Sequence, residues 1–167
     1  MKKCIALVAH DNCKSDLIDW VSYNWHTLAK HKLVCTGNTG ELVGKALLEK
    51  SDQSVDLHRL KSGPLGGDQQ LGAMISEGQV DILIFLWDAI SVQPHDVDVK
   101  ALLRIAVLCS VPTACNRATA YFVISSALLK KPYTPKNNKE QIQTYLERDL
   151  PVWTFANVLV DHHLKGK

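Results

Sequence analysis

Apolar runs of strand length alternate with amphipathic stretches of helical length along most of this chain. The clearest run, Val80–Trp87, is almost continuously apolar, as is typical of a strand buried on both faces of a parallel sheet. The other predicted strands are Cys4–Ala9, Lys32–Cys35, a weakly alternating segment at Val55–His58, and Val111–Cys115. The predicted helices are Asp16–Ala29, a segment ending near Glu49, Asp68–Glu77 with Gly78 as its C-cap, Asp98–Leu108, Thr119–Leu129 and Glu140–Leu150. This alternation predicts a three-layer α/β fold, with a mainly parallel sheet, helices on both faces and Rossmann- or flavodoxin-like winding.

Length and charge narrow the possible functions. The 167 residues suit one domain, residues 1–167, with a C-terminal extension from about residue 150. A net charge of +2 with scattered basic residues argues against a nucleic-acid partner. The apolar runs are only of strand length and the first residues lack a signal-peptide core, so we expect no membrane partner and a cytoplasmic location.

Five cysteines form an odd set without any C-x-x-C pair. Three of them, Cys4, Cys35 and Cys115, fall inside apolar strand-like runs, where cysteine usually acts as a small hydrophobic residue. We therefore expect buried thiols, and neither disulfides nor a zinc site.

Polar residues follow each predicted strand at its carboxyl end. Ligands of parallel α/β sheets bind outside these ends, so the polar residues are expected to converge on a pocket. They are His10-Asp11, Thr36-Gly37-Asn38-Thr39, Ser62-Gly63, Asp88 and Asn116.

The segment Ser62–Gln70, SGPLGGDQQ, is the most informative motif. Its glycines permit positive φ and close backbone approach, and Pro64 fixes one turn dihedral. Asp68 then stands at the expected start of a helix, where a carboxylate also serves as a simple cap. Both a functional carboxylate and a capping turn fit this motif when it is taken alone.

Two further motifs suit an anionic ligand. The string Thr36-Gly37-Asn38-Thr39-Gly40 at a helix N-terminus fits a phosphate, although a plain capping turn has the same composition. It is also similar to the phosphate loop of flavodoxins, but here it follows the second strand rather than the first, which argues against a flavin. Lys14 can reach an anion and His10 can donate to an oxygen, with a solvated lysine and a loop histidine as the alternatives.

Carboxylates and a histidine follow the strongest strand. Asp88 ends this strand, and a buried carboxylate there is expected to cap, pair or bind. His95 precedes Asp98 by three residues, so the carboxylate can orient the imidazole; the alternative is that Asp98 only caps the next helix. Metal binding is the rival interpretation, but the spacing matches no metal-ligand rule, and we favour a site without metal or cofactor.

Taken together, these motifs make the chain resemble the methylglyoxal synthase family, from the first strand to about Ser125. The resemblance rests on IALVAHD at residues 5–11, TGNTG at 36–40, SGPLGGDQQ at 62–70, and WD at 87–88 with PHDVDVKALLR at 94–104. It implies an enzyme that converts dihydroxyacetone phosphate to methylglyoxal and inorganic phosphate without a cofactor. It also implies a homohexamer that inorganic phosphate inhibits.

The resemblance assigns roles to particular residues. Asp68 would be the base, His95 would bond the substrate oxygens and shuttle protons, and Asp98 would orient His95. The remaining residues would bind substrate or phosphate: His10, Lys14, Thr36, Asn38, Thr39, Ser62, Gly63, Asp88 as an accessory carboxylate, and Arg148 reaching the phosphate across a subunit boundary.

The chain departs from the family pattern in places. Asn38 replaces a common threonine, Asp52–Lys61 is longer than the usual connection, and Arg148 aligns only loosely. Two rival functions stay open at this point: an effector-binding regulatory module of the same fold without turnover, and, more distantly, a flavodoxin-like electron carrier.

Overall fold

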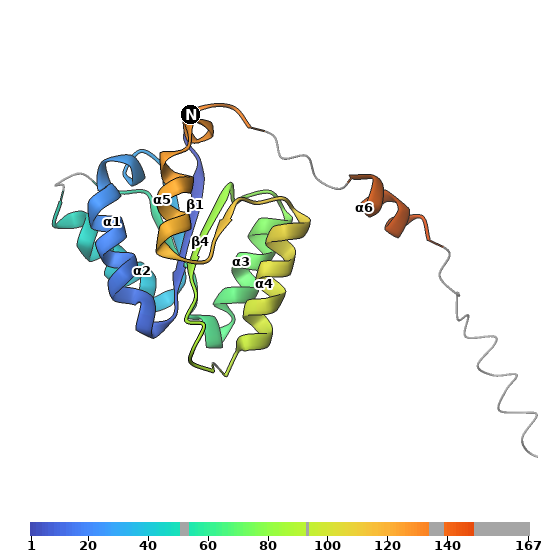
Figure 1. Cartoon of the computed structure of the whole chain (residues 1–167), viewed down its shortest axis with the longest axis horizontal. Coiled ribbons are helices and arrows are strands. Elements are labelled where there is room, and N and C mark those ends of the chain that lie inside the picture. Colours follow the sequence, from blue (N-terminus) through green and yellow to red (C-terminus); the bar gives the residue numbers. More distant parts are fainter. Residues whose placement is uncertain (51–53, 93, 134–138, 149–167) are drawn as a thin grey trace, which may run out of the picture. The chain divides into compact units, whose positions relative to one another are not determined.

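The computed structural model describes residues 1–50, 54–92, 94–133 and 139–148. The chain divides into two compact units, Met1–Asn137 and Asn138–Lys167. The first contains a five-stranded parallel sheet in the order β3-β2-β1-β4-β5 (Figure 1). Its strands are β1 (Cys4–Ala9), β2 (Lys32–Cys35), β3 (Leu57–Arg59), β4 (Ile82–Leu86) and β5 (Thr113–Ala114).

Helices cover both faces of this sheet, which confirms the predicted three-layer α/β fold (Figure 1). One face carries α1 (Lys14–Leu28), α2 (Gly37–Leu48) and α5 (Arg117–Ser125), and the other carries α3 (Gly67–Ser76) and α4 (Asp96–Leu108). Short 3₁₀ turns η1 (Asp11–Cys13), η2 (Gly63–Leu65) and η3 (Ala127–Lys130) complete this unit, and the second unit contains α6 (Lys139–Leu146).

The central strand β1 explains the two cores. All of its residues are buried, and alternate side chains point to opposite faces because the side-chain period of a strand is two residues. Ile5 and Leu7 enter the core under α1, α2 and α5, together with the fully buried Trp20. Ala6 and Val8 enter the core under α3 and α4. A continuous apolar run is therefore what a strand with helices on both faces requires.

Most predicted elements exist, but several boundaries differ. The weak third strand is real and pairs with β2 through Leu33↔Leu57. Helix α4 starts at Asp96, so Asp98 lies in its first turn and the N-cap position is His95. The predicted helix Thr119–Leu129 was wrong at its end: α5 stops at Ser125, and the extended Ser126 accepts a hydrogen bond from the Leu128 N–H that starts η3.

The prediction of buried thiols holds for two of the five cysteines. Cys4 and Cys35 are buried, and burial raises the pKa of the Cys35 thiol to about 12. Cys115 is only partly buried because it lies just beyond β5, and all five thiols are free. Within the described part of the chain, no helix combines the length and the apolarity needed to cross a membrane.

The loop from Ser62 to Gly67 is packed tightly against its surroundings. Gly66 has a φ of +96°, in the left-handed region that favours glycine. A Cβ atom on Gly67 would lie 2.1 Å from the carbonyl oxygen of Lys61, and one on Gly37 would lie 2.8 Å from Cα of Ser62. Glycine at these positions therefore lets the loop approach the N-terminus of α2.

We predict that Gly67→Ala destabilises the protein by about 1–3 kcal/mol, because the added methyl group must displace backbone atoms. Gly44→Ala is the matched control, since a Cβ atom there meets nothing within 4 Å inside α2. It should stabilise the protein by about 0.5–1 kcal/mol through the better helix propensity of alanine. Urea unfolding measures both free energies, and equal effects of the two changes would contradict the close packing.

Candidate active site

A cavity of about 360 Å³ lies at the carboxyl ends of β1, β2 and β4. This edge of the sheet is the topological switch point, because the chain leaves β1 in one direction to form β2 and β3 and in the other to form β4 and β5. The cavity is lined by Val8, Ala9, His10, Asp11, Lys14, Thr36, Asn38, Thr39, Ser62, Gly63, Pro64, Asp68, Phe85, Pro94 and His95. Most of the residues predicted from sequence are thus brought together here.

Backbone hydrogen bonds hold the turn that carries Asp68. The N–H groups of Leu65 and Gly67 both donate to the carbonyl oxygen of Ser62, at 3.0 and 2.9 Å. The turn ends directly in the first residues of α3, so Asp68 stands in the first turn of a helix and is only 4% exposed. The backbone, not a flexible side chain, therefore fixes the position of this carboxylate.

Asp68 and His95 face each other across Gly63. Asp68 Oδ2 lies 3.8 Å from His95 Nε2, and a Cβ atom on Gly63 would lie 2.9 Å from that oxygen and 3.1 Å from that nitrogen. Gly63 therefore leaves room for a reactant at the point where the two groups converge. Asp68 Oδ2 has no hydrogen-bond partner among the described residues, although it is buried.

Burial controls the protonation of these groups. Removal from water raises the pKa of Asp68, and nearby Asp98 raises it further, while His95 opposes both. An unpartnered carboxylate with a raised pKa is suited to accept a proton near neutral pH.

His10 offers a defined hydrogen-bond donor. Its Nδ1 accepts the backbone N–H of Asp88 at 3.2 Å, so in the neutral imidazole the proton must reside on Nε2. Nε2 is buried without a partner among the described residues, on a side chain that lines the cavity. Burial and the neighbouring His95 lower the pKa of His10, which favours this neutral form. The cavity thus contains an N–H group that is free to donate to a ligand.

The opposite wall of the cavity suits an anion. Thr36 is the N-cap of α2 and Thr39 lies in its first turn; both are buried, and no hydrogen bond from the Thr36 side chain caps the helix. The first N–H groups of a helix have no intrahelical acceptor, and the helix dipole also favours negative charge. Lys14, at the start of α1, lies on the same cavity and pairs with Asp11. Hydroxyls, backbone N–H groups and one ammonium group therefore surround this end.

Three predicted site residues lie elsewhere. Asp98 lines a groove between α3 and α4 that also reaches Asp68. His95 Nδ1 has no hydrogen-bond partner among the described residues, and the bond that joins these two residues runs between their backbones, from the Asp98 N–H to the His95 carbonyl oxygen at 2.9 Å. Asp88 does not line the cavity, because its carboxylate turns back onto its own loop. Arg148 belongs to the second unit, where its guanidinium stacks over the Tyr145 ring at 3.4 Å.

Sequence reasoning missed several lining residues and one contact. Asp11 was expected at the pocket, but its ion pair with Lys14 was not, although the three-residue spacing of opposite charges could have signalled it. Phe85 packs edge-on against His10 with ring centroids 5.2 Å apart, but nothing distinguishes it from other core residues in the sequence. Asn116, which was expected near the pocket, caps α5 by accepting from the Thr119 N–H at 2.9 Å.

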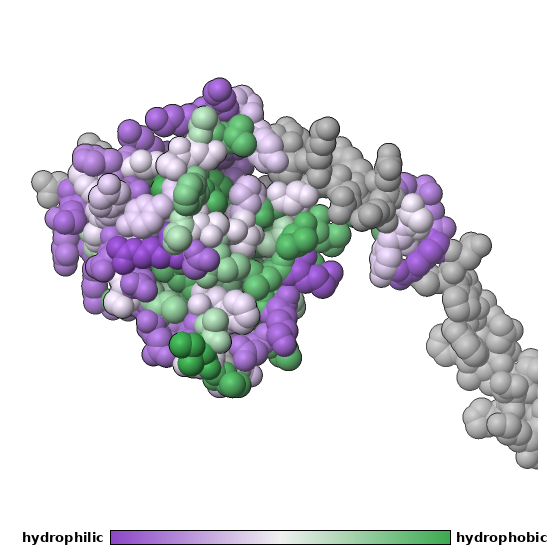
Figure 2. All heavy atoms as spheres, in the orientation of Figure 1, coloured by the Kyte–Doolittle hydropathy of each residue, from purple (hydrophilic) through white to green (hydrophobic). Residues whose placement is uncertain are grey.

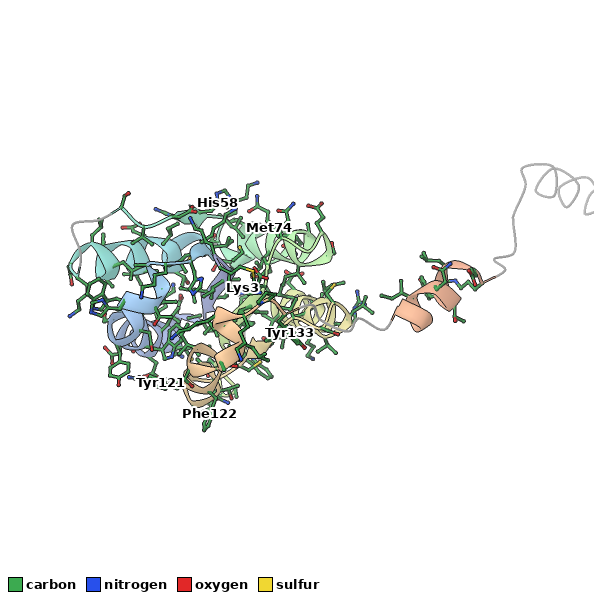
Figure 3. The ribbon with its side chains drawn as sticks, turned by 90° about the horizontal axis from the view of Figure 1, so that it is seen from above. Lys3, His58, Met74, Tyr121, Phe122 and Tyr133 are labelled. Carbon is green, nitrogen blue, oxygen red and sulfur yellow. The ribbon has the colours of Figure 1, made fainter. Side chains whose placement is uncertain are left out.

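A larger cavity, of about 480 Å³, lies at the opposite edge of the sheet. Its wall is mainly apolar and includes Lys3, Phe122 and Tyr133, which Figure 3 labels on the face that carries the start of β1. The one ammonium group there, on Lys3, already pairs with Asp81 at 3.3 Å. This cavity lacks the convergent donors and acceptors of the first. Across the described residues, no group of three or more His, Cys, Asp or Glu side chains is placed to hold a metal ion.

Comparisons with known proteins show which family the chain resembles. Residues 17–115 match the family described as MGS-like domain. The methylglyoxal synthase of Maridesulfovibrio salexigens is 54% identical over 155 residues, covering 89% of this chain and 98% of that protein. The methylglyoxal synthase of Pectobacterium atrosepticum is 52% identical over 131 residues, covering 78% of this chain and 82% of that protein.

The fold has a solved counterpart as well. The crystal structure of methylglyoxal synthase from Elizabethkingia anophelis superposes with a TM-score of 0.76 at 45% identity, covering 90% of this chain and 94% of that one. The family match and these relatives show that the chain belongs to the methylglyoxal synthase family.

Proposed function

We propose that this protein is a carbon–oxygen lyase that converts dihydroxyacetone phosphate to methylglyoxal and inorganic phosphate. The observation that carries the proposal is the buried, unpartnered carboxylate of Asp68, 3.8 Å from His95 Nε2, in a cavity whose other wall suits a phosphate. The named relatives support the same reaction.

The reaction begins with proton abstraction. Asp68 removes a proton from the hydroxyl-bearing carbon next to the carbonyl, and the electron pair moves onto the carbonyl oxygen to give an enediolate. N–H groups of His95 and His10 are available to stabilise this oxygen, because both imidazoles line the cavity. Asp98, which shares the α3–α4 groove with Asp68, acts in this scheme through the pKa of Asp68.

Phosphate then leaves from the other end of the triose. The C–O bond to phosphate breaks with its electron pair going to phosphate, while the hydroxyl proton of the enediolate moves to its other oxygen. The resulting enol then takes up a proton at its CH₂ carbon and releases the proton on its oxygen, which gives methylglyoxal without a net gain of protons. The C–O bond to phosphate must lie out of the enediolate plane, since elimination needs overlap with the π system. Thr36, Asn38, Thr39, Ser62 and Lys14 at the anion end supply contacts that enforce this torsion. The proton on Asp68 returns to the departing phosphate or to water.

Several further proposals follow from this site. Free phosphate should inhibit, because it carries the same charge and shape as the part of the substrate that the anion end binds. We retain the expected cytoplasmic location and homohexamer, with Arg148 contributing across a subunit boundary. Exposed apolar side chains near the cavity mouth support association: Ile90 and Val92 are 94% and 89% exposed, and Figure 2 shows hydrophobic residues at this lower end. An effector-binding module without turnover is less favoured, because binding alone does not require an unpartnered buried carboxylate.

The direct test is incubation of the purified protein with dihydroxyacetone phosphate in the presence of a metal chelator. We expect methylglyoxal and inorganic phosphate to appear in equal amounts, since one elimination releases one of each. A colorimetric assay of phosphate and derivatisation of methylglyoxal measure both. Binding of the triose phosphate without either product would instead support the regulatory module.

Replacement of the base should separate binding from chemistry. We predict that Asp68→Asn lowers kcat by about 10²–10⁴-fold and changes KM little, because the amide fills the same space but cannot take a proton. Glu77→Gln, an exposed position at the end of the same helix, is the matched control and should be neutral. Turnover by Asp68→Asn close to that of the control would refute the assignment.

The pH dependence of kcat/KM should reflect the buried base. Asp68 must be ionised to act, and its pKa is raised above the ordinary 3.8, so activity should fall with acid at a pH above that value. Asp98→Asn removes a negative charge that raises this pKa, so it should move the acid limb to lower pH. An acid limb that stays in place in Asp98→Asn would contradict the coupling between the two carboxylates.

A further inference from the structure

The carboxylate of Asp88 is buried and fully engaged outside the cavity. Its Oδ1 accepts from the backbone N–H groups of Ile90 at 2.9 Å and Ser91 at 3.1 Å, and its Oδ2 accepts from Asn12 Nδ2 at 2.7 Å. These hydrogen bonds hold the pKa of Asp88 well below its usual range, so the group stays charged. A carboxylate with this set of donors is part of a structural link and has little capacity left for a ligand.

The link joins two segments that both contribute residues to the cavity wall. Asn12 belongs to η1, between His10 and Lys14, while Asp88 begins the loop that leads from β4 to His95. Asn12 Nδ2 also lies 3.2 Å from Ser91 Oγ, which adds a second contact across the same gap. We call the contact of Asn12 with Asp88 and Ser91 the loop clamp. It ties the segment that carries Lys14 to the segment that carries His95.

The clamp also bears on His10. The side chain of Asp88 fixes the turn that follows it, and the backbone N–H of the same residue donates to His10 Nδ1 at 3.2 Å. The His10 ring packs edge-on against Phe85 and His95, with centroids 5.2 and 5.9 Å away, and its buried Nε2 has no hydrogen-bond partner among the described residues. Movement of Asp88 would therefore free His10 Nδ1 and allow the other tautomer.

We propose that Asp88 is a positioning residue: through the loop clamp it holds His10 as the Nε2–H tautomer and keeps Lys14 and His95 at one cavity. This deepens the proposed function and rests on it, because the Nε2–H group of His10 would then donate to an oxygen of the triose. Asp88 acts through other residues and touches no substrate, which differs from the accessory pocket role expected from the sequence.

A charge exchange across the clamp tests the proposal. Asn12→Asp places two carboxylates where the 2.7 Å contact stands, so we expect kcat to fall about tenfold or more with a smaller change in KM. Asp88→Asn keeps an oxygen for Ile90 and Ser91, but the Asn12 amide must rotate to meet the new amide and then releases Ser91 Oγ, so we expect kcat to fall less than in Asn12→Asp. The double variant Asn12→Asp/Asp88→Asn rebuilds a donor–acceptor pair with the roles reversed and should recover kcat to within about threefold of wild type.

A measurement without turnover separates this proposal from the proposed function. The ¹⁵N chemical shifts of the His10 imidazole should report the Nε2–H tautomer in wild type and in the double variant, and a tautomer mixture in Asn12→Asp. If the wild-type protein makes no methylglyoxal, the proposed function fails. The chemical shifts would still show whether the loop clamp sets the tautomer of His10. Asn12→Ala, which only removes the amide, should also give a tautomer mixture of His10 and a lower kcat. It replaces Asn12→Asp in the test if that variant does not fold.

Two results would overturn the clamp. One is an unchanged His10 tautomer and kcat in both folded Asn12 variants. The other is a double variant that folds with wild-type thermal stability yet stays as impaired as Asn12→Asp, since a restored contact should then have restored the positions of the loops.

Discussion

The rest of the site depends on the burial of one unpartnered carboxylate at the start of α3. Asp68 Oδ2 is hidden from water without a hydrogen bond from the described residues, and such a group costs about 1–3 kcal/mol of stability. The surrounding structure must therefore hold it in place. It does so through the backbone bonds to Ser62 and through glycines that let the turn pack against Lys61 and α2. The stability lost at this point is offset by the two apolar cores on either face of the sheet.

The sheet separates stability from chemistry in space. Its interior is filled by continuous apolar strands, whereas polar side chains gather only beyond the carboxyl ends. Because parallel strands all end at one edge, segments that follow β1, β2, β3 and β4 meet there although they are far apart in the chain. Asp68, the two imidazoles and the N-terminus of α2 each come from a different connection. The loop clamp from Asn12 to Asp88 links two of these connections and thereby holds their loops in a fixed relative position.

Local patterns predicted much of this. The apolar run Val80–Trp87 identified β4, and the SGPLGGDQQ segment placed Asp68 at a helix start, because period and turn chemistry act over a few residues. The error at the end of α5 is also local. The apolar pattern continues beyond Ser125, but Ser126 adopts an extended backbone and caps the next turn, which ends the helix. The role of Asp98 in orienting His95 stays a prediction; the structure adds that Asp98 lines the groove that also reaches Asp68.

The sequence by itself determined the order of strands and helices, the positions where only glycine fits, and the kinds of chemical group available. Only the tertiary structure decided which groups face one another. The contact of Asp88 with Asn12, the tautomer of His10 and the 3.8 Å approach of His95 to Asp68 all involve residues separated by tens of positions. Their geometry is set by sheet register and by packing between layers, and periodicity within any one segment contains no information about either.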